Sequence, residues 1–178
     1  MHKIHGCRRL LQHGFTLVEL LIVVIILAIL AAIVVPQFSS TTTDAKLASL
    51  DSTLSNVRSS LDLYLQQHTA YPGAVTSTGT CGVGTNAAGA INTEAAMLAQ
   101  LTNYTDANGL ACSIASATVK FGPYMKKVLP PDPIMGVATV EISTTGDLAM
   151  TATGTAGGWK YDVKSGKFIM NHTTYQAR

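Results

Sequence analysis

One continuous apolar stretch near the start of the chain dominates its pattern of hydrophobic and polar positions. Leu20 to Val35 contains no charged residue, no Gly and no Pro, and Glu19 directly precedes it. At 1.5 Å per residue, a helix over 15–35 is about 30 Å long, close to the thickness of one hydrocarbon core. The basic residues before it are Lys3, Arg8 and Arg9. This pattern predicts one membrane-spanning helix over 15–35 with a positive cytoplasmic flank.

Beyond the apolar stretch the pattern takes on a helical period. Apolar residues recur at alternating spacings of three and four, at Leu47, Leu50, Leu54, Val57, Leu61 and Tyr64. This spacing predicts an amphipathic continuation of the helix over 36–67, and we expect its stripe to pack on the chain's own head rather than in a coiled-coil seam. Pro36 removes one intrahelical hydrogen bond, so we expect a kink or local melting there. The breaker cluster 71–73 predicts that the helix ends near His68.

The remaining residues, 68–178, predict a single head domain. Small and polar residues over 75–90 predict an irregular surface loop, and Asn92 or Thr93 can cap a short helix over 94–101. The last third changes to β-rich runs separated by Gly turns, at 137–142, 147–153, 159–163 and 167–170. These runs predict an antiparallel meander of three or four strands, with one face covered by the amphipathic helix. The predicted fold class is α+β.

Glu19 is the charged residue that the apolar stretch has to accommodate. An ionised carboxylate at the bilayer centre costs about 2.5–3.5 kcal/mol, so an acid kept in such a helix is a functional candidate. No basic residue follows it before Lys46. Cutting the chain after Gly14 would supply a new cation, the α-amine of Phe15.

The residues Gly14-Phe15-Thr16-Leu17-Val18-Glu19 after a short basic leader resemble the class III signal of type IV prepilins and type II secretion pseudopilins. The resemblance implies that a dedicated peptidase cuts between Gly14 and Phe15 on the cytoplasmic face of the inner membrane and methylates the Phe15 amine. It also implies a pilin-like ladle, in which the long helix packs on a small antiparallel sheet. Glu19 would pair with the N-terminal amine of a neighbouring subunit, with Leu17 and Pro36 as further candidate assembly residues.

The same resemblance implies a domain organisation and a set of partners. It divides the chain into a cleaved leader (1–14), a transmembrane and assembly helix (15–35), its amphipathic continuation (36–67) and a periplasmic head (68–178). The implied partners are further copies, other pseudopilins, the prepilin peptidase and methyltransferase, an inner-membrane platform with its ATPase, and membrane lipid before assembly. The implied location is the bacterial inner membrane, crossed once, and then a periplasmic pseudopilus.

Two segments of the head favour the secretion branch of this family. Gly122 to Pro133 and Gly158 to Asp162 look like the head of major pseudopilins, where a Lys-Lys and Pro-rich turn precedes a Tyr-bearing strand. Many major pseudopilins bind calcium in a loop rich in Asp and Gly. Here the candidate acids are separated, so we expect no calcium and no other metal. These acids are Asp132, Asp147 and Asp162.

The cysteines predict a bond in the head. Removal of the leader would discard Cys7 and leave Cys81 and Cys112 as an even pair in an extracytoplasmic domain. We expect a disulfide between them, and the alternative is two free thiols.

Charge and residue chemistry argue against nucleic-acid binding and catalysis. Without the leader, nine Lys and Arg face ten Asp and Glu, so we expect no nucleic-acid partner. The adjacent pair Lys126 and Lys127 is typical of a solvated turn. His68 and His172 have no second ligand or base beside them in the sequence, so we expect ordinary surface histidines, no cofactor and no enzyme activity. Trp159 is expected in the core.

Three functions remain open on the sequence alone. The first is a structural subunit of a type II secretion pseudopilus. The second is a type IV pilin for adhesion, motility or DNA uptake, which shares the whole N-terminal signal. The third belongs to a different class, a membrane-anchored periplasmic binding module, and it predicts no cleavage at Gly14 and no dependence on Glu19.

Overall fold

The computed structural model describes residues 15–178, apart from the side chains of residues 35–40. The leader 1–14, with Gly14 at its end, lies outside the described residues. The chain divides into two compact units, Met1–Thr43 and Asp44–Arg178. Each unit is described below by itself.

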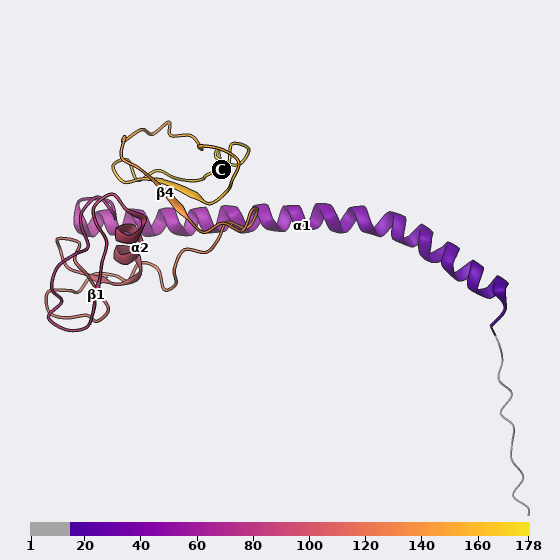
Figure 1. Cartoon of the computed structure of the whole chain (residues 1–178), viewed down its shortest axis with the longest axis horizontal. Coiled ribbons are helices and arrows are strands. Elements are labelled where there is room, and N and C mark those ends of the chain that lie inside the picture. Colours follow the sequence, from indigo (N-terminus) through magenta and orange to yellow (C-terminus); the bar gives the residue numbers. More distant parts are fainter. Residues whose placement is uncertain (1–14) are drawn as a thin grey trace, which may run out of the picture. The chain divides into compact units, whose positions relative to one another are not determined.

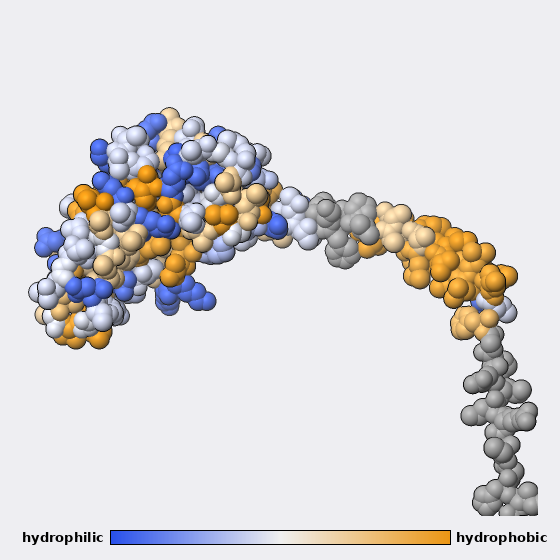
Figure 2. All heavy atoms as spheres, viewed as in Figure 1, coloured by the Kyte–Doolittle hydropathy of each residue, from blue (hydrophilic) through white to orange (hydrophobic). Residues whose placement is uncertain are grey.

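The described part of the first unit consists mainly of the beginning of α1, a helix of 52 residues that spans Leu17–His68 (Figure 1). One segment of α1, Leu17–Val34, is long and apolar enough to cross a membrane, and none of it is buried. Its large apolar side chains are 42 to 82% exposed. Figure 2 shows this end of the helix as an almost continuous apolar surface.

The helix α1 continues through Pro36 without a break, so of the two alternatives expected at this position, a kink or local melting, the local melting is wrong. A proline removes only one intrahelical hydrogen bond. The long apolar run on its N-terminal side and the amphipathic stretch on its C-terminal side both favour the helix, and one missing bond does not interrupt it. The side chain of Pro36 lies outside the described residues.

The second unit is built on the amphipathic part of α1. Five residues of the predicted stripe are 0 to 1% exposed, and Leu47 is half-buried. The buried five are Leu50, Leu54, Val57, Leu61 and Tyr64. The helix ends at His68 as predicted. A second helix, α2 (Glu94–Thr102), is capped by Thr93, whose side chain accepts a hydrogen bond of 3.2 Å from the Ala96 N–H. The predicted short helix and its cap are therefore confirmed.

A mixed three-stranded sheet faces α1, made by β4 (Val140–Ser143), β5 (Trp159–Asp162) and β6 (Phe168–Met170) in that order. The pair β5 and β6 is antiparallel, but β4 and β5 are parallel, with Val140 opposite Trp159. The antiparallel meander is therefore wrong in two respects, because the run 147–153 is also not a strand. The connection 144–158 is long enough to bring the chain back to the start of β4, and parallel strands require such a crossover.

A second small sheet was not predicted. Its strands are only two residues long and lie in the order β1 (Asn86–Ala87), β3 (Ala111–Cys112) and β2 (Tyr104–Thr105), all antiparallel. Cys112 of β3 forms a disulfide with Cys81, and the Cα atoms of the two residues are 5.9 Å apart. Strands of two residues leave no alternating pattern that a sequence could show.

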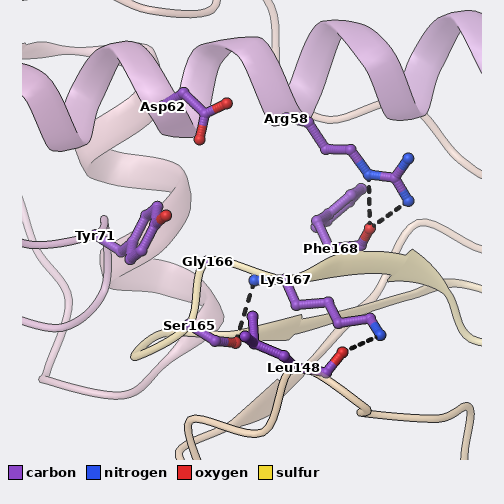
Figure 3. Close-up of a pocket in the computed structure, with 8 residues that line it drawn as sticks. All are labelled: Arg58, Asp62, Tyr71, Leu148, Ser165, Gly166, Lys167 and Phe168. Atoms are coloured by element: carbon purple, nitrogen blue, oxygen red, sulfur yellow. Dashed lines mark hydrogen bonds between the residues drawn. The ribbon is translucent and has the colours of Figure 1, made fainter.

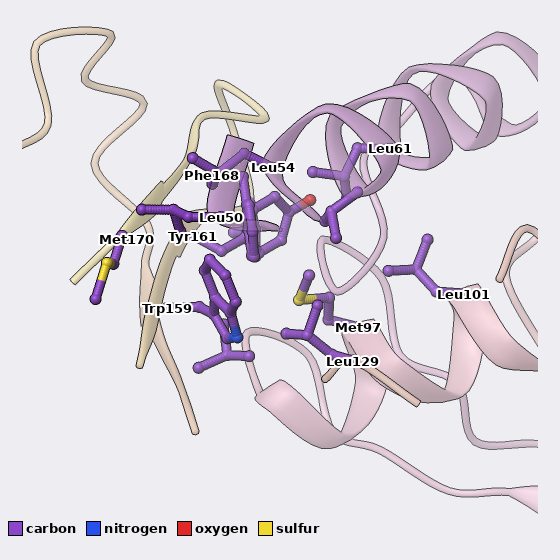
Figure 4. Close-up of a cluster of buried hydrophobic side chains, with 13 residues drawn as sticks. Leu50, Leu54, Leu61, Met97, Leu101, Leu129, Trp159, Tyr161, Phe168 and Met170 are labelled. Atoms are coloured by element: carbon purple, nitrogen blue, oxygen red, sulfur yellow. The ribbon is translucent and has the colours of Figure 1, made fainter. Parts of the chain in front are cut away.

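The core of the second unit lies between α1, α2 and the mixed sheet (Figure 4). Trp159 is fully buried, as predicted, and its ring stacks on Phe168 with centroids 5.3 Å apart. Its Nε1–H donates a 3.0 Å hydrogen bond to the Pro130 carbonyl. The protein is thus of the α+β class, and its amphipathic helix buries its stripe against the head.

Candidate functional site

The N-terminus of α1 is shaped by Thr16 and Glu19. The Thr16 N–H donates a 2.9 Å hydrogen bond to Oε2 of Glu19, and the Glu19 N–H donates one of 3.2 Å to Oγ1 of Thr16. The Thr16 hydroxyl also donates to the same Oε2 at 2.8 Å. This reciprocal arrangement is a capping box, in which the cap residue and the third helical residue each satisfy a free N–H of the other.

The capping box uses only half of the Glu19 carboxylate. Both recorded bonds to this group end on Oε2, and no described residue donates to Oε1. The negative charge also lies in the first turn of α1, where the helix dipole favours it. The carboxylate is therefore held in place by its own chain and retains an oxygen that can accept a bond from another cation.

The residues next to this capping box are open to their surroundings. Phe15 precedes the helix and is 81% exposed, and Leu17 begins it and is equally exposed. Gly14, the expected cleavage position, lies outside the described residues. Sequence reasoning found Glu19 but missed Thr16, although a Thr three residues before a Glu at the start of an apolar run is the signature of a capping box.

In the head, Asp162 joins the end of β4 to the turn after β5. Its Oδ2 accepts hydrogen bonds from the Ser143 hydroxyl (2.9 Å) and the Gly146 N–H (3.0 Å). Its Oδ1 accepts bonds from the N–H groups of Lys164 (2.9 Å) and Ser165 (2.8 Å). Burial by itself would raise the pKa of Asp162, but these donors outweigh it and hold the pKa well below its usual range.

Asp132 has the same kind of role at the turn after Pro130. It accepts hydrogen bonds from the N–H groups of Met135 (2.6 Å), Val137 (3.0 Å) and Gly158 (2.9 Å). Burial again raises its pKa, and the backbone donors together lower it below the ordinary value. Two of the three acids considered as calcium ligands, Asp132 and Asp162, thus bind the protein's own loops. Among residues 15–178, no group of three or more His, Cys, Asp or Glu is placed to hold a metal ion.

His68 is buried, so the expectation of a surface histidine is wrong. Its ring stacks on Tyr64 with centroids 4.0 Å apart, and its Nε2 lies 2.9 Å from Oγ1 of Thr105. Burial lowers the pKa of His68 and favours the neutral ring. The sequence did contain a signal for this position, because His68 follows Tyr64 by four residues and continues the apolar stripe of α1.

The comparison with protein families supports an interpretation of the N-terminal site. Residues 9–35 match the family model of the prokaryotic N-terminal methylation motif. This motif indicates a prepilin-type substrate, a pilin or a pseudopilin, which is processed by prepilin peptidase and assembles with other pilin-like subunits. Proteins with this motif are structural subunits rather than enzymes. The apolar helix and the motif together fit a single-pass inner-membrane anchor. No curated protein and no solved structure matches the chain.

Proposed function

We propose that the protein is a structural subunit of a type II secretion pseudopilus. It is first inserted in the inner membrane with its head in the periplasm, and residues 1–14 are then cleaved off. The processed subunits polymerise and help to push folded proteins through an outer-membrane channel. A cytoplasmic ATPase acting through a membrane platform would supply the power. The observation that carries this proposal is Glu19, a carboxylate held at the start of an exposed apolar helix with one oxygen available.

Processing would complete the charge pair. Cleavage between Gly14 and Phe15 creates an amine on Phe15, which is then methylated and keeps its positive charge. In the fibre this amine pairs with Glu19 of a neighbouring subunit. Removing one partner of a buried charge pair typically costs about 3–5 kcal/mol, so the pair favours subunits in the correct axial register.

The exposed stretch Leu17–Val34 supports polymerisation as the second part of the proposal. Its side chains have no partner within the described residues of their own unit that buries them, so they need either lipid or further copies. In the fibre, packing of 17–35 between subunits supplies most of the assembly energy, because close contact replaces lipid by protein along the whole helix.

The choice of a secretion pseudopilus over a surface pilus rests on the head. The segments Gly122 to Pro133 and Gly158 to Asp162 resemble those of major pseudopilins. In the structure the two segments are joined, because Asp132 accepts the Gly158 N–H and Trp159 donates to Pro130. A type IV pilin remains the second candidate, because it carries the same N-terminal motif.

The first experiment deletes the chain and measures the extracellular proteins, with surface fibres imaged in parallel. Loss of specific secreted proteins with surface fibres unchanged is the expected result. Loss of surface fibres with secretion intact would show a type IV pilin instead. Normal secretion and normal fibres, with an uncleaved chain, would favour a membrane-anchored binding module.

Variants at Glu19 separate the two roles of its side chain. Glu19→Gln keeps a residue that can complete a capping box but removes the charge, whereas Glu19→Ala removes both. We expect both variants to be cleaved after Gly14 and neither to assemble, as judged by the mass of the N-terminal peptide and by fibre imaging. Normal fibres from Glu19→Gln would contradict charge pairing. Asp147→Asn, an exposed head residue, is the matched control and should assemble normally.

A further inference from the structure

A groove lies in the head between α1 and the segment 124–130. Asn56, Ser59 and Ser60 form its α1 side, and the whole hollow measures about 730 Å³. Its other side contains apolar groups, including Val128, which is 65% exposed. Lys126 and Lys127 lie in the same wall and are both exposed. The groove therefore combines an apolar surface with two positive charges.

The two lysines have no acid of their own in the described structure. The recorded salt bridges join Lys160 to Glu141 and Arg178 to Asp51, and no hydrogen bond from either lysine ammonium to residues 15–178 is recorded. The sequence predicts only a solvated turn for Lys126 and Lys127, and this prediction assigns them no binding partner. Its charge complements a carboxylate on another molecule.

A carboxylate without a partner lies on the other flank of the same helix. With about 100° of rotation per residue, the side of α1 that lines the groove and the side that bears Asp62 flank the buried stripe on opposite sides. Asp62 is exposed, and no described residue forms a hydrogen bond or ion pair with it. The nearest cation along the helix, Arg58, instead donates bonds of 3.0 and 2.9 Å to the Phe168 carbonyl (Figure 3).

We propose that Asp62 of one copy pairs with Lys126 and Lys127 in the groove of the next copy. This inference rests on the proposed function, because it needs the neighbouring copies that the proposed fibre brings together. It joins two different surfaces of the same chain, and such a heterologous contact repeats without closing when its rotation does not form a ring. Charge pairs of this kind fix register and partner more than they add affinity.

Charge reversal and exchange test the contact in a strain that assembles the full chain. Asp62→Lys alone, and Lys126→Glu with Lys127→Glu, should each reduce the amount of fibre at least tenfold. The variant with all three substitutions restores opposite charges and should return to within twofold of wild type. Asp147→Lys and Lys164→Glu are the matched controls, because both are exposed head charges outside these surfaces, and they should assemble as wild type does.

Cross-linking gives a second readout that does not depend on the effect of charge on folding. A chain with Asp62→Cys and Lys127→Cys should form a ladder of covalent oligomers when assembled fibres are oxidised. Each single variant should give no ladder, and neither should Asp147→Cys combined with Lys127→Cys. Cys81 and Cys112 are already joined within the chain and do not contribute.

The outcomes separate this inference from the function on which it rests. Normal fibres from the reversed variants would overturn the contact. The contact would also be overturned if the reversed variants lose their fibres, the variant with all three substitutions does not restore them, and the cysteine pair forms no ladder of covalent oligomers. A wild type that forms no fibre, or a Glu19→Ala variant that forms normal ones, would overturn the proposed function first and this contact with it.

Discussion

The two halves of α1 are parts of one helix, but they differ in what covers their apolar side chains. Between Leu17 and Val34 the large side chains are 42 to 82% exposed on every side of the helix. Between Leu50 and Tyr64 the apolar stripe is 0 to 1% exposed, because the head packs on it. The first half is apolar all round, and the second only along one face.

This difference shows which half of α1 a single chain can stabilise without lipid or further copies. A stripe that is apolar on one face needs a single partner surface, and residues 68–178 supply it. A helix that is apolar on all faces needs an apolar environment on all faces, which lipid or a bundle of copies provides. Folding of the head and assembly of the fibre therefore depend on separate sets of residues.

The largest expected effect comes from a matched pair of leucines. Leu54→Ala removes a fully buried side chain from the head and should lower its free energy of unfolding by about 4 kcal/mol, within the usual range for such sites. Leu27→Ala, in the exposed half, should leave head stability within about 0.5 kcal/mol of wild type. Urea unfolding of the full chain in detergent, followed by fluorescence of Trp159, measures both. Equal effects would contradict the separation of the two halves.

The disulfide should give a slightly smaller effect. Replacing Cys81 and Cys112 by Ser frees a loop whose ends are 31 positions apart, and the chain-entropy model gives about 3.5 kcal/mol for its closure. The same urea unfolding experiment should show this loss in the head. Membrane insertion, measured by resistance to alkaline extraction, should not change. An unchanged unfolding midpoint would show that the bond does not stabilise the head.

Acid should weaken the head through its anchoring carboxylates. The pKa of Asp162 is lower in the folded head than its ordinary value of 3.8, so its contribution is complete above about pH 4 and is lost as pH falls further. Asp162→Asn should remove about 2 kcal/mol at pH 7, because it weakens several charge-assisted hydrogen bonds. It should also reduce the loss of stability between pH 4 and pH 2, measured by urea unfolding across this range. A wild-type slope in the variant would contradict this origin.

The smallest expected loss of head stability comes from removing a helix cap, and it can be compared between the caps of α2 and α1. Thr93→Ala removes the side chain that caps α2 and should lower head stability by about 1 kcal/mol. Thr16→Ala removes the corresponding group from α1 and should leave head stability unchanged, because this cap lies in the first unit. Thr80→Ala, an exposed loop residue, serves as the control. A head destabilised by Thr16→Ala would show that the two units unfold together.

Patterns that depend on local spacing could be predicted from the sequence. The stripe of α1, its end at His68, and the helix α2 with its Thr93 cap all follow from periodicity and capping residues within a few positions of one another. The burial of Trp159 follows from its size and apolar ring. Glu19 could be identified because a charge at the start of a long apolar run stands out.

Features that depend on the path of the chain could not be predicted from the sequence. The parallel pairing of β4 and β5 is decided by how the connection 144–158 returns, and β-rich runs look alike in either direction. The roles of Asp132 and Asp162 depend on N–H groups from distant segments, which converge only in the folded head. The cleavage position, Gly14, stays a prediction.

The connection 144–158 offers a practical use. Thr153 is held by its neighbours, because its N–H donates to Asn171 and its hydroxyl to Glu141, and Gly157 is buried at the other side. Thr155 and Ala156 between them are exposed. Exposed loop tips with small or polar residues tolerate insertions. A short epitope tag between Thr155 and Ala156 would therefore label every subunit in a living cell without disturbing the sheet.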